Sequence, residues 1–120
     1  MFVGTLEPRK NIEGLIQAYN LLNDGLKKKY KLVICGGNGW YYDKIFKLVN
    51  DLKLNDNIIF TGYAKEQDMS SIYSGASLFV FPSFYEGFGL PILEAFTCGI
   101  PVLVSNNSSL PEVAGNAAVY

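Results

Sequence analysis

Two glutamates, eight positions apart, stand out as side chains that could do chemistry. Glu86 and Glu94 flank Gly87 and Gly89, where a helix is expected to begin. Glycines at a helix start leave its first backbone amides uncovered, and such amides bind anions. A carboxylate, in contrast, accepts hydrogen bonds from the vicinal hydroxyls of a sugar. The segment therefore suits a ligand that combines phosphate groups with sugar hydroxyls.

Short apolar runs alternate with helical patterns, and these elements must position the two glutamates. Strands are expected at residues 1–4, 32–35, 58–61, 78–81 and 102–104, and a last one at 117–119. Helices are expected at residues 11–22, 41–52, 66–74 and 90–98, with one turn at 111–114, and Asn11 is expected to cap the first helix. Strands that are apolar on both faces and separated by single helices predict an α/β fold, a Rossmann-like doubly wound parallel sheet.

Each expected strand is followed by a loop rich in glycine or polar residues. The carboxyl ends of parallel strands lie along one edge of the sheet, where ligands bind. The dinucleotide fingerprint Gly-x-Gly-x-x-Gly does not follow the first strand, and the partial match at Gly37 and Gly39 has Tyr42 in place of the third glycine. No phosphate-binding Gly-x-x-x-x-Gly-Lys-Ser/Thr loop occurs either.

The segment at residues 84–95 resembles the Glu-x7-Glu motif of the GT4-type, or group 1, glycosyltransferases. Further segments are similar to the same family in the same order: residues 3–11, 32–37, 59–63, 99–102 and 110–113. The resemblance implies the C-terminal donor-binding domain of a two-domain GT-B enzyme. It also implies transfer of a sugar from a nucleotide-diphosphate sugar to an acceptor with retention, in glycan or polysaccharide biosynthesis.

The resemblance assigns roles to the residues of this motif. Glu94 would bind the ribose hydroxyls of the donor, and Glu86 would contact the transferred sugar and act in catalysis. The backbone amides that would hold the diphosphate and the sugar are those near Phe88, Gly89 and Leu90.

Other parts of the resemblance supply the positive charge and the contact with the base. Lys10 would neutralise the diphosphate and act in catalysis. Many family members carry an arginine where this chain has Thr5, so Arg9 is a candidate to replace that arginine. Backbone around Gly62 and Tyr63 would meet the base of the nucleotide.

Simpler roles stand beside these assignments. Glu86, Glu94 and Lys10 could be ordinary solvated side chains. The aromatic residues 40–42 could stack on a sugar or pack as an aromatic helix start. Both glutamates are expected at an open cleft, so their substitution is expected to leave stability nearly unchanged.

Composition narrows the possible functions. A net charge of −1 argues against a dedicated nucleic-acid binder, and the lysines at 27–29 and 31 read as a solvated helix end. The absence of histidine excludes zinc sites and Ser-His or Cys-His nucleophilic machinery within the chain. Without an Asp-x-Asp pair, no metal and no cofactor are expected. Cys35 and Cys98 lie in apolar runs and indicate reduced core thiols of a cytoplasmic protein.

The chain is expected to be a piece of a longer protein. No apolar stretch is long enough to span a bilayer. The chain begins and ends inside expected strands, so we expect one excised domain, residues 1–120, whose acceptor-binding N-terminal partner domain is missing. Two alternatives remain: half of a nucleotide-sugar 2-epimerase, which would be expected to use histidine, and a non-catalytic nucleotide-binding module.

Overall fold

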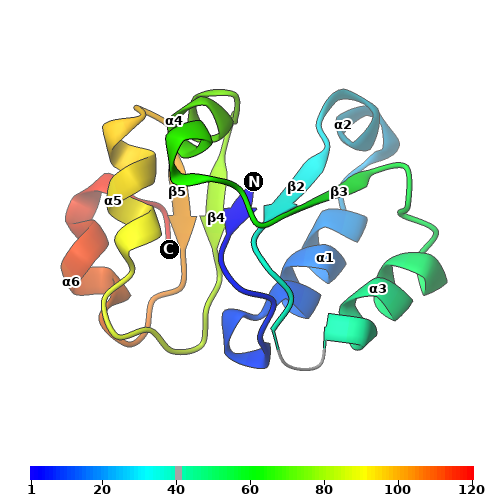
Figure 1. The fold of residues 1–120 in the computed structure, drawn as a ribbon, viewed down its shortest axis with the longest axis horizontal. Helices are drawn as coiled ribbons and strands as arrows, with labels where there is room; N and C mark the ends of the chain where they lie inside the picture. The colour runs from blue at the N-terminus through cyan, green and yellow to red at the C-terminus, as the bar shows by residue number, and fades with distance from the viewer. Residues whose placement is uncertain (40–41) are drawn as a thin grey trace.

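Strands and helices alternate along the chain in the computed structural model, which describes residues 1–39 and 42–120 (Figure 1). The strands are β1 Phe2–Val3, β2 Leu32–Cys35, β3 Ile58–Gly62, β4 Phe79–Phe81 and β5 Val102–Val104. The α-helices are α1 Ile12–Asn20, α2 Asp24–Lys29, α3 Tyr42–Asp51, α4 Glu66–Ser74, α5 Leu90–Thr97 and α6 Leu110–Ala114. Two 3₁₀ turns complete the set, η1 Pro8–Lys10 and η2 Gly115–Ala117.

All pairings between these strands are parallel. β1, β2 and β3 form one sheet with β2 in the middle, and β4 pairs with β5. The amide of Val80 donates to the carbonyl oxygen of Met1 at 2.8 Å, which places β4 beside β1. The strands therefore follow the spatial order β3, β2, β1, β4, β5, and the direction of winding reverses between β1 and β4. The predicted α/β fold with parallel strands is confirmed, although the pairing is divided into two sheets.

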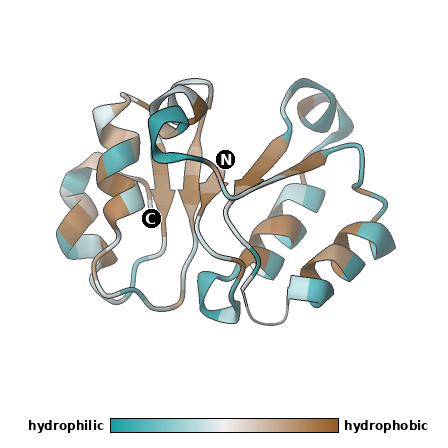
Figure 2. Cartoon of the chain, in the orientation of Figure 1, coloured by the Kyte–Doolittle hydropathy of each residue, from teal (hydrophilic) through white to brown (hydrophobic). Residues whose placement is uncertain are grey.

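Burial of apolar strand residues holds the halves together (Figure 2). The rings of Phe2 and Phe81 stack at 6.0 Å across the junction of β1 and β4, and Phe79 stacks on Phe81 at 5.7 Å. Helix α1 buries one apolar face, which consists of Ile12, Leu15, Ile16 and Tyr19. In Figure 1, α1 and α3 lie beside the β1–β3 half, and α5 and α6 flank β4 and β5.

Several sequence predictions about the elements are wrong. Helix α2 was not predicted, although its last turn contains the lysine run that was expected at a helix end. Asn11 occupies the N-cap position of α1 with a φ of 54°, but its side chain makes no capping bond and donates to the Pro82 carbonyl at 3.2 Å. The expected last strand is the 3₁₀ turn η2 followed by a single bridge between Val119 and Leu103.

Candidate functional site

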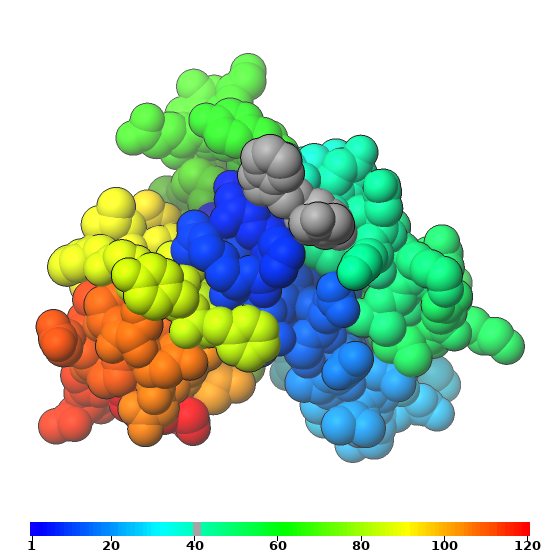
Figure 3. Space-filling view, turned by 90° about the horizontal axis from the view of Figure 1, so that it is seen from below, coloured from blue at the N-terminus to red at the C-terminus, as the bar shows by residue number. Residues whose placement is uncertain are grey.

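The loops after β1 and β4 meet at the point where the strand order reverses. The amide of Phe84 donates to the Arg9 carbonyl at 2.8 Å, and the Asn11 side chain reaches Pro82. Figure 3 shows these two loops side by side on the lower face, the first in blue and the second in yellow-green. Ligands of open α/β sheets bind outside the carboxyl ends of the strands at such a reversal. The predicted ligand edge thus contains a junction of two loops that are distant in sequence, since Arg9 and Glu86 lie 77 positions apart.

Glu86 is the centre of a charged cluster at this junction. Its Oε1 accepts from Lys10 Nζ at 2.6 Å and its Oε2 from an Arg9 NH group at 2.8 Å. The Nε of Arg9 donates in turn to Glu7 at 2.9 Å. Glu86 is 7% exposed and Lys10 is 8% exposed. The expectation that Glu86 stands at an open cleft is therefore wrong, because the two cations hold it inside the junction.

The cluster keeps Glu86 ionised. Burial raises the pKa of this carboxyl, but hydrogen bonds from Lys10 and Arg9 outweigh burial and hold the pKa below its usual range. The buried Ser83 hydroxyl lies close enough to lower this pKa too, yet makes no hydrogen bond of normal geometry within the described part of the chain. The hydrogen bond to Glu86 raises the pKa of Arg9. Lys10 also lies over the Phe81 ring, 5.1 Å from its centroid.

Two serines before α6 hold the loop that carries Glu86. Ser108 Oγ donates to the Glu86 carbonyl at 2.7 Å and accepts from the Glu86 amide at 3.2 Å. Ser109 Oγ donates to the carbonyls of Glu86 and Phe88 at 3.0 and 3.2 Å. Sequence reasoning missed both residues. Serines before a short helix usually indicate a cap, whereas Ser109 makes no capping bond and binds the neighbouring loop instead.

The start of α5 has the features expected of an anion site. Gly89 occupies the N-cap position with a φ of 102°, and no side chain caps the helix. A Cβ at Gly89 would approach Leu110 Cδ2 to 3.0 Å, so both the conformation and the space favour glycine. The flanking side chains of Phe88 and Leu90 are exposed. The helix thus begins between Glu86 and Glu94 without a side-chain cap, and Gly89 itself is buried.

Glu94 lies one turn into α5 and is fixed by a residue of α4 that lies outside the motif. The Tyr73 hydroxyl, from α4, donates to Glu94 Oε2 at 2.7 Å. Tyr73 is 1% exposed, whereas Glu94 is exposed. Burial, followed by the hydrogen bond to Glu94, raises the pKa of Tyr73. Glu94 therefore presents its carboxylate at the surface while a buried hydroxyl anchors one of its oxygens.

A family model for group 1 glycosyl transferases matches residues 1–119 of the chain.

The chain belongs to the group 1 glycosyltransferase family.

The relatives agree with this assignment. The chain is 49% identical to O-antigen chain mannosyltransferase B of Escherichia coli over 119 residues, which cover 99% of this chain and 31% of that protein. WaaG, a glycosyltransferase involved in lipopolysaccharide biosynthesis, superposes with a TM-score of 0.82 at 26% identity, over 94% of this chain and 30% of WaaG. Anabaena HepE, solved with UDP-glucose, shares the fold with a TM-score of 0.80 at 24% identity, over 92% of this chain and 31% of HepE. The predicted GT-B family and Rossmann-like fold are confirmed, and the chain spans about a third of each protein.

Gly62 and Tyr63 lie at the same edge of this glycosyltransferase domain but in a different half from Glu86. Gly62 ends β3 with a φ of 68°, and its carbonyl accepts from the Gly36 amide at 2.9 Å. Tyr63 is 81% exposed. Strand β2 separates β3 from β1, so these residues and the Glu86 cluster lie at different places along one edge of the sheet. No hydrogen bond or ion pair among the described residues joins them.

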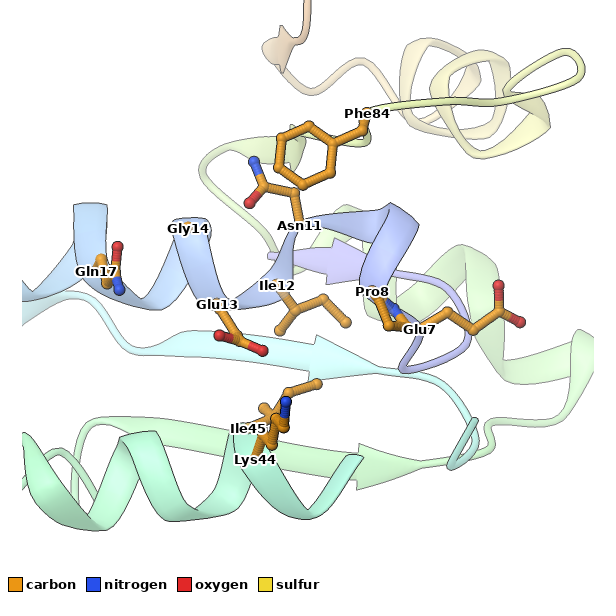
Figure 4. A pocket seen from close by; sticks show the side chains of 10 residues that line it. All are labelled: Glu7, Pro8, Asn11, Ile12, Glu13, Gly14, Gln17, Lys44, Ile45 and Phe84. Atoms are coloured by element: carbon orange, nitrogen blue, oxygen red, sulfur yellow. The ribbon is translucent and has the colours of Figure 1, made fainter. Parts of the chain in front are cut away.

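A separate pocket of about 530 Å³ lies beside the first loop, on the side of α1 and α3 (Figure 4). Its walls include Glu7, Asn11, Glu13, Lys44 and Phe84, and none of the predicted site residues lines it. Of the aromatic residues 40–42, residues 40 and 41 lie outside the described residues. Tyr42 packs edge-on against Phe46 at 6.0 Å, as expected for an aromatic helix start.

Neither a metal-binding cluster nor a membrane-spanning helix occurs among the described residues. Residues 1–39 and 42–120 contain no group of three or more His, Cys, Asp or Glu residues that could hold a metal ion. No helix in the same ranges is long and apolar enough to cross a bilayer. Positive charge near the predicted site is supplied by Arg9 and Lys10.

Proposed function

We propose that the chain is the donor-binding domain of an enzyme that transfers a sugar from a nucleotide-diphosphate sugar to an acceptor with retention, in polysaccharide biosynthesis. An N-terminal domain would bind the acceptor. The observation that carries the proposal is the junction of the two loops, where Lys10 and Arg9 hold Glu86 beside the uncapped start of α5. A carboxylate, two cations and a helix start without a side-chain cap thus belong to the same loop junction, as a ligand with hydroxyls and phosphates would require.

Relatives support the nature of the donor. The relative at 49% identity is named an O-antigen chain mannosyltransferase, and HepE was solved with UDP-glucose. A mannosyl group carried by a nucleoside diphosphate is therefore the first donor to test. Glu86 would contact the transferred sugar and Glu94 the ribose. The base would lie near Gly62 and Tyr63, and the amides of Gly89 and Leu90 would face the diphosphate.

The chemistry of the proposed reaction is mainly electrostatic. As the bond to the leaving nucleoside diphosphate breaks, negative charge grows on the phosphates and positive charge grows at the sugar carbon. Lys10, Arg9 and the positive end of α5 would stabilise the leaving group, because preorganised charges and dipoles stabilise charge that develops during reaction. The carboxylate of Glu86, kept ionised by its two partners, would face the positive centre.

A paired titration of the full-length protein tests the proposal. Nucleotide mannoses with different bases are first screened by thermal shift, and the best ligand and its free nucleoside diphosphate are then titrated by calorimetry. Glu94→Gln should weaken both ligands by similar factors, about tenfold, because a charge-assisted hydrogen bond to ribose contributes about 1.5–3 kcal/mol. Glu86→Gln should weaken the nucleotide sugar without weakening the free diphosphate. Equal losses for both ligands in the Glu86 variant would contradict the assigned roles.

A further inference from the structure

Tyr73 joins α4 to the one glutamate of the proposed site that is exposed. Its hydroxyl donates to Glu94 Oε2 at 2.7 Å, across 21 positions of sequence. We propose that Tyr73 is a positioning residue for donor binding: it holds the Glu94 carboxylate so that the second oxygen, Oε1, is directed at the ribose hydroxyls. This inference rests on the proposed function, because it assumes that Glu94 binds the ribose.

The support behind the Tyr73 hydroxyl is rigid. The ring is 1% exposed and packs edge-on against Phe79 of β4, with centroids 5.5 Å apart and an interplanar angle of 61°. Strand β4 leads directly into the loop of Glu86, so the same core element supports both glutamates of the motif. A hydroxyl fixed in this way cannot follow a moving carboxylate, and the carboxylate must therefore adopt the position that the hydroxyl sets.

Glu94 needs such support because it is an exposed side chain with several rotatable bonds. An unrestrained glutamate must lose rotamer freedom when it binds a ligand, and this loss weakens binding. A carboxylate that is already held by one oxygen has lost that freedom before the ligand arrives, so its contact with ribose gains affinity. Because Tyr73 uses Oε2, the lone pairs of Oε1 remain for hydroxyl donors.

A purely structural role for this hydrogen bond makes a different prediction. A buried tyrosine hydroxyl generally needs an acceptor, and Glu94 could serve only as that acceptor. Removal of the hydroxyl would then change stability alone. A positioning role requires, in addition, that removal of the hydroxyl reduces the preference for a ligand with ribose hydroxyls over one without them.

The test uses Tyr73→Phe in the full-length protein, with Tyr19→Phe as the matched control. Tyr19 is also a buried tyrosine, and its hydroxyl donates at 2.7 Å to the carbonyl of Tyr30, the residue after α2. Each protein is titrated by calorimetry with the preferred nucleoside diphosphate and with its 2′,3′-dideoxy form. The quantity measured is the dissociation constant of the dideoxy form divided by that of the ribose form, which expresses the preference for ribose hydroxyls.

We expect Tyr73→Phe to lower this ratio about fivefold, the equivalent of one ordinary hydrogen bond, and Tyr19→Phe to leave it unchanged. In the double variant Tyr73→Phe/Glu94→Gln the ratio should match that of Glu94→Gln alone, because Tyr73 acts through Glu94. A wild-type ratio retained in Tyr73→Phe would overturn the inference, as would a Tyr73→Phe protein that fails to fold while Tyr19→Phe folds. If the wild-type protein itself does not prefer the ribose form, the ribose role of Glu94 in the proposed function fails instead.

Discussion

Replacement of Glu86 by glutamine should destabilise the fold, in contrast to what an open-cleft glutamate would do. The substitution keeps the shape of the side chain and removes its charge. Lys10, whose side chain is only 9% exposed, would keep an acceptor but lose its counter-charge. The ammonium would then be buried without compensation, which is the arrangement that makes broken buried ion pairs costly.

The two ion pairs of Glu86 differ in what they contribute. Breaking a buried pair costs about 3–5 kcal/mol, and the glutamine amide oxygen retains part of the hydrogen bond to Lys10. The pair with Arg9 adds little, about 0–1 kcal/mol, because the Arg9 side chain is 44% exposed and is screened by solvent. We therefore expect Glu86→Gln to lower the free energy of unfolding by about 2–4 kcal/mol. A typical domain, with about 5–15 kcal/mol, remains folded after such a loss.

Urea unfolding at neutral pH measures this loss, with Asp51→Asn as the control. Asp51 pairs with Lys47 at 2.6 Å, the same distance as Glu86 and Lys10, but both side chains are exposed. The control should lose less than about 0.5 kcal/mol. Equal losses in the two variants would refute the reasoning, because burial of the pair would then make no difference.

The pH dependence gives an independent check of the same ion pairs. The pKa of Glu86 is lower in the folded protein than the usual value of 4.5. Its ionised form therefore stabilises the fold at pH values above 4.5, and this contribution is lost as the pH falls through the lowered folded pKa. The difference in stability between wild type and Glu86→Gln should thus be full at neutral pH and shrink as the pH falls below 4.5 and through the lowered folded pKa. A difference that stays constant into acid would refute the role of the charge.

Two further predictions concern the anion site. Donor binding to the full-length protein should persist in EDTA, because Lys10, Arg9 and the α5 amides supply the positive charge; loss of calorimetric binding in EDTA would contradict this. Gly89→Ala should cost about 1–3 kcal/mol, since its φ of 102° and the 3.0 Å approach to Leu110 both oppose a Cβ. Gly87→Ala is the control, because a Cβ at Gly87 would meet no atom within 4 Å. Similar urea midpoints for both variants would show that the conformation of Gly89 is unimportant.

The sequence predicts the order of strands and helices well because most elements show a regular pattern of apolar residues. The helix patterns near residues 11–22 and 66–74 match α1 and α4 closely. Helix α2 is not predicted because its six residues contain no apolar stripe and bury no side chain, so the periodicity of apolar residues does not indicate a helix there. The final strand fails for a related reason: the apolar run at 117–119 pairs through a single bridge, and a run that short does not determine its partner.

In the site, the residues of the motif can be predicted from the sequence, whereas the contacts between separate elements cannot. The motif predicts Glu86 and Glu94 as site residues, and the family resemblance predicts Lys10. The fold brings Glu86 and Lys10 together across 76 positions. Burial of Glu86 could not be predicted, since nothing local to its loop indicates that two cations from another loop will enclose it. Tyr73 and Ser108 were missed for the same reason. Their contacts with the motif join separate elements, and their sequence spacing fits a core residue and a helix cap equally well.

The charges of the cluster also constrain how the proposed site could bind a donor. Arg9 and Lys10 face Glu7 and Glu86, so two cations balance two carboxylates and the cluster has no net charge. A diphosphate would therefore compete with Glu86 for both cations, and part of its affinity must come from the amides of α5. Removal of the Glu86 charge frees Lys10 and Arg9 for the phosphates, so Glu86→Gln should bind free nucleoside diphosphate at least as tightly as wild type, although it is less stable to urea. If Glu86 had only a structural role, Glu86→Gln would lower stability without raising the affinity for free nucleoside diphosphate. If Glu86 only contacted the sugar, the substitution would change neither quantity. Calorimetry and urea unfolding of this one variant therefore distinguish these two cases from competition for the cations.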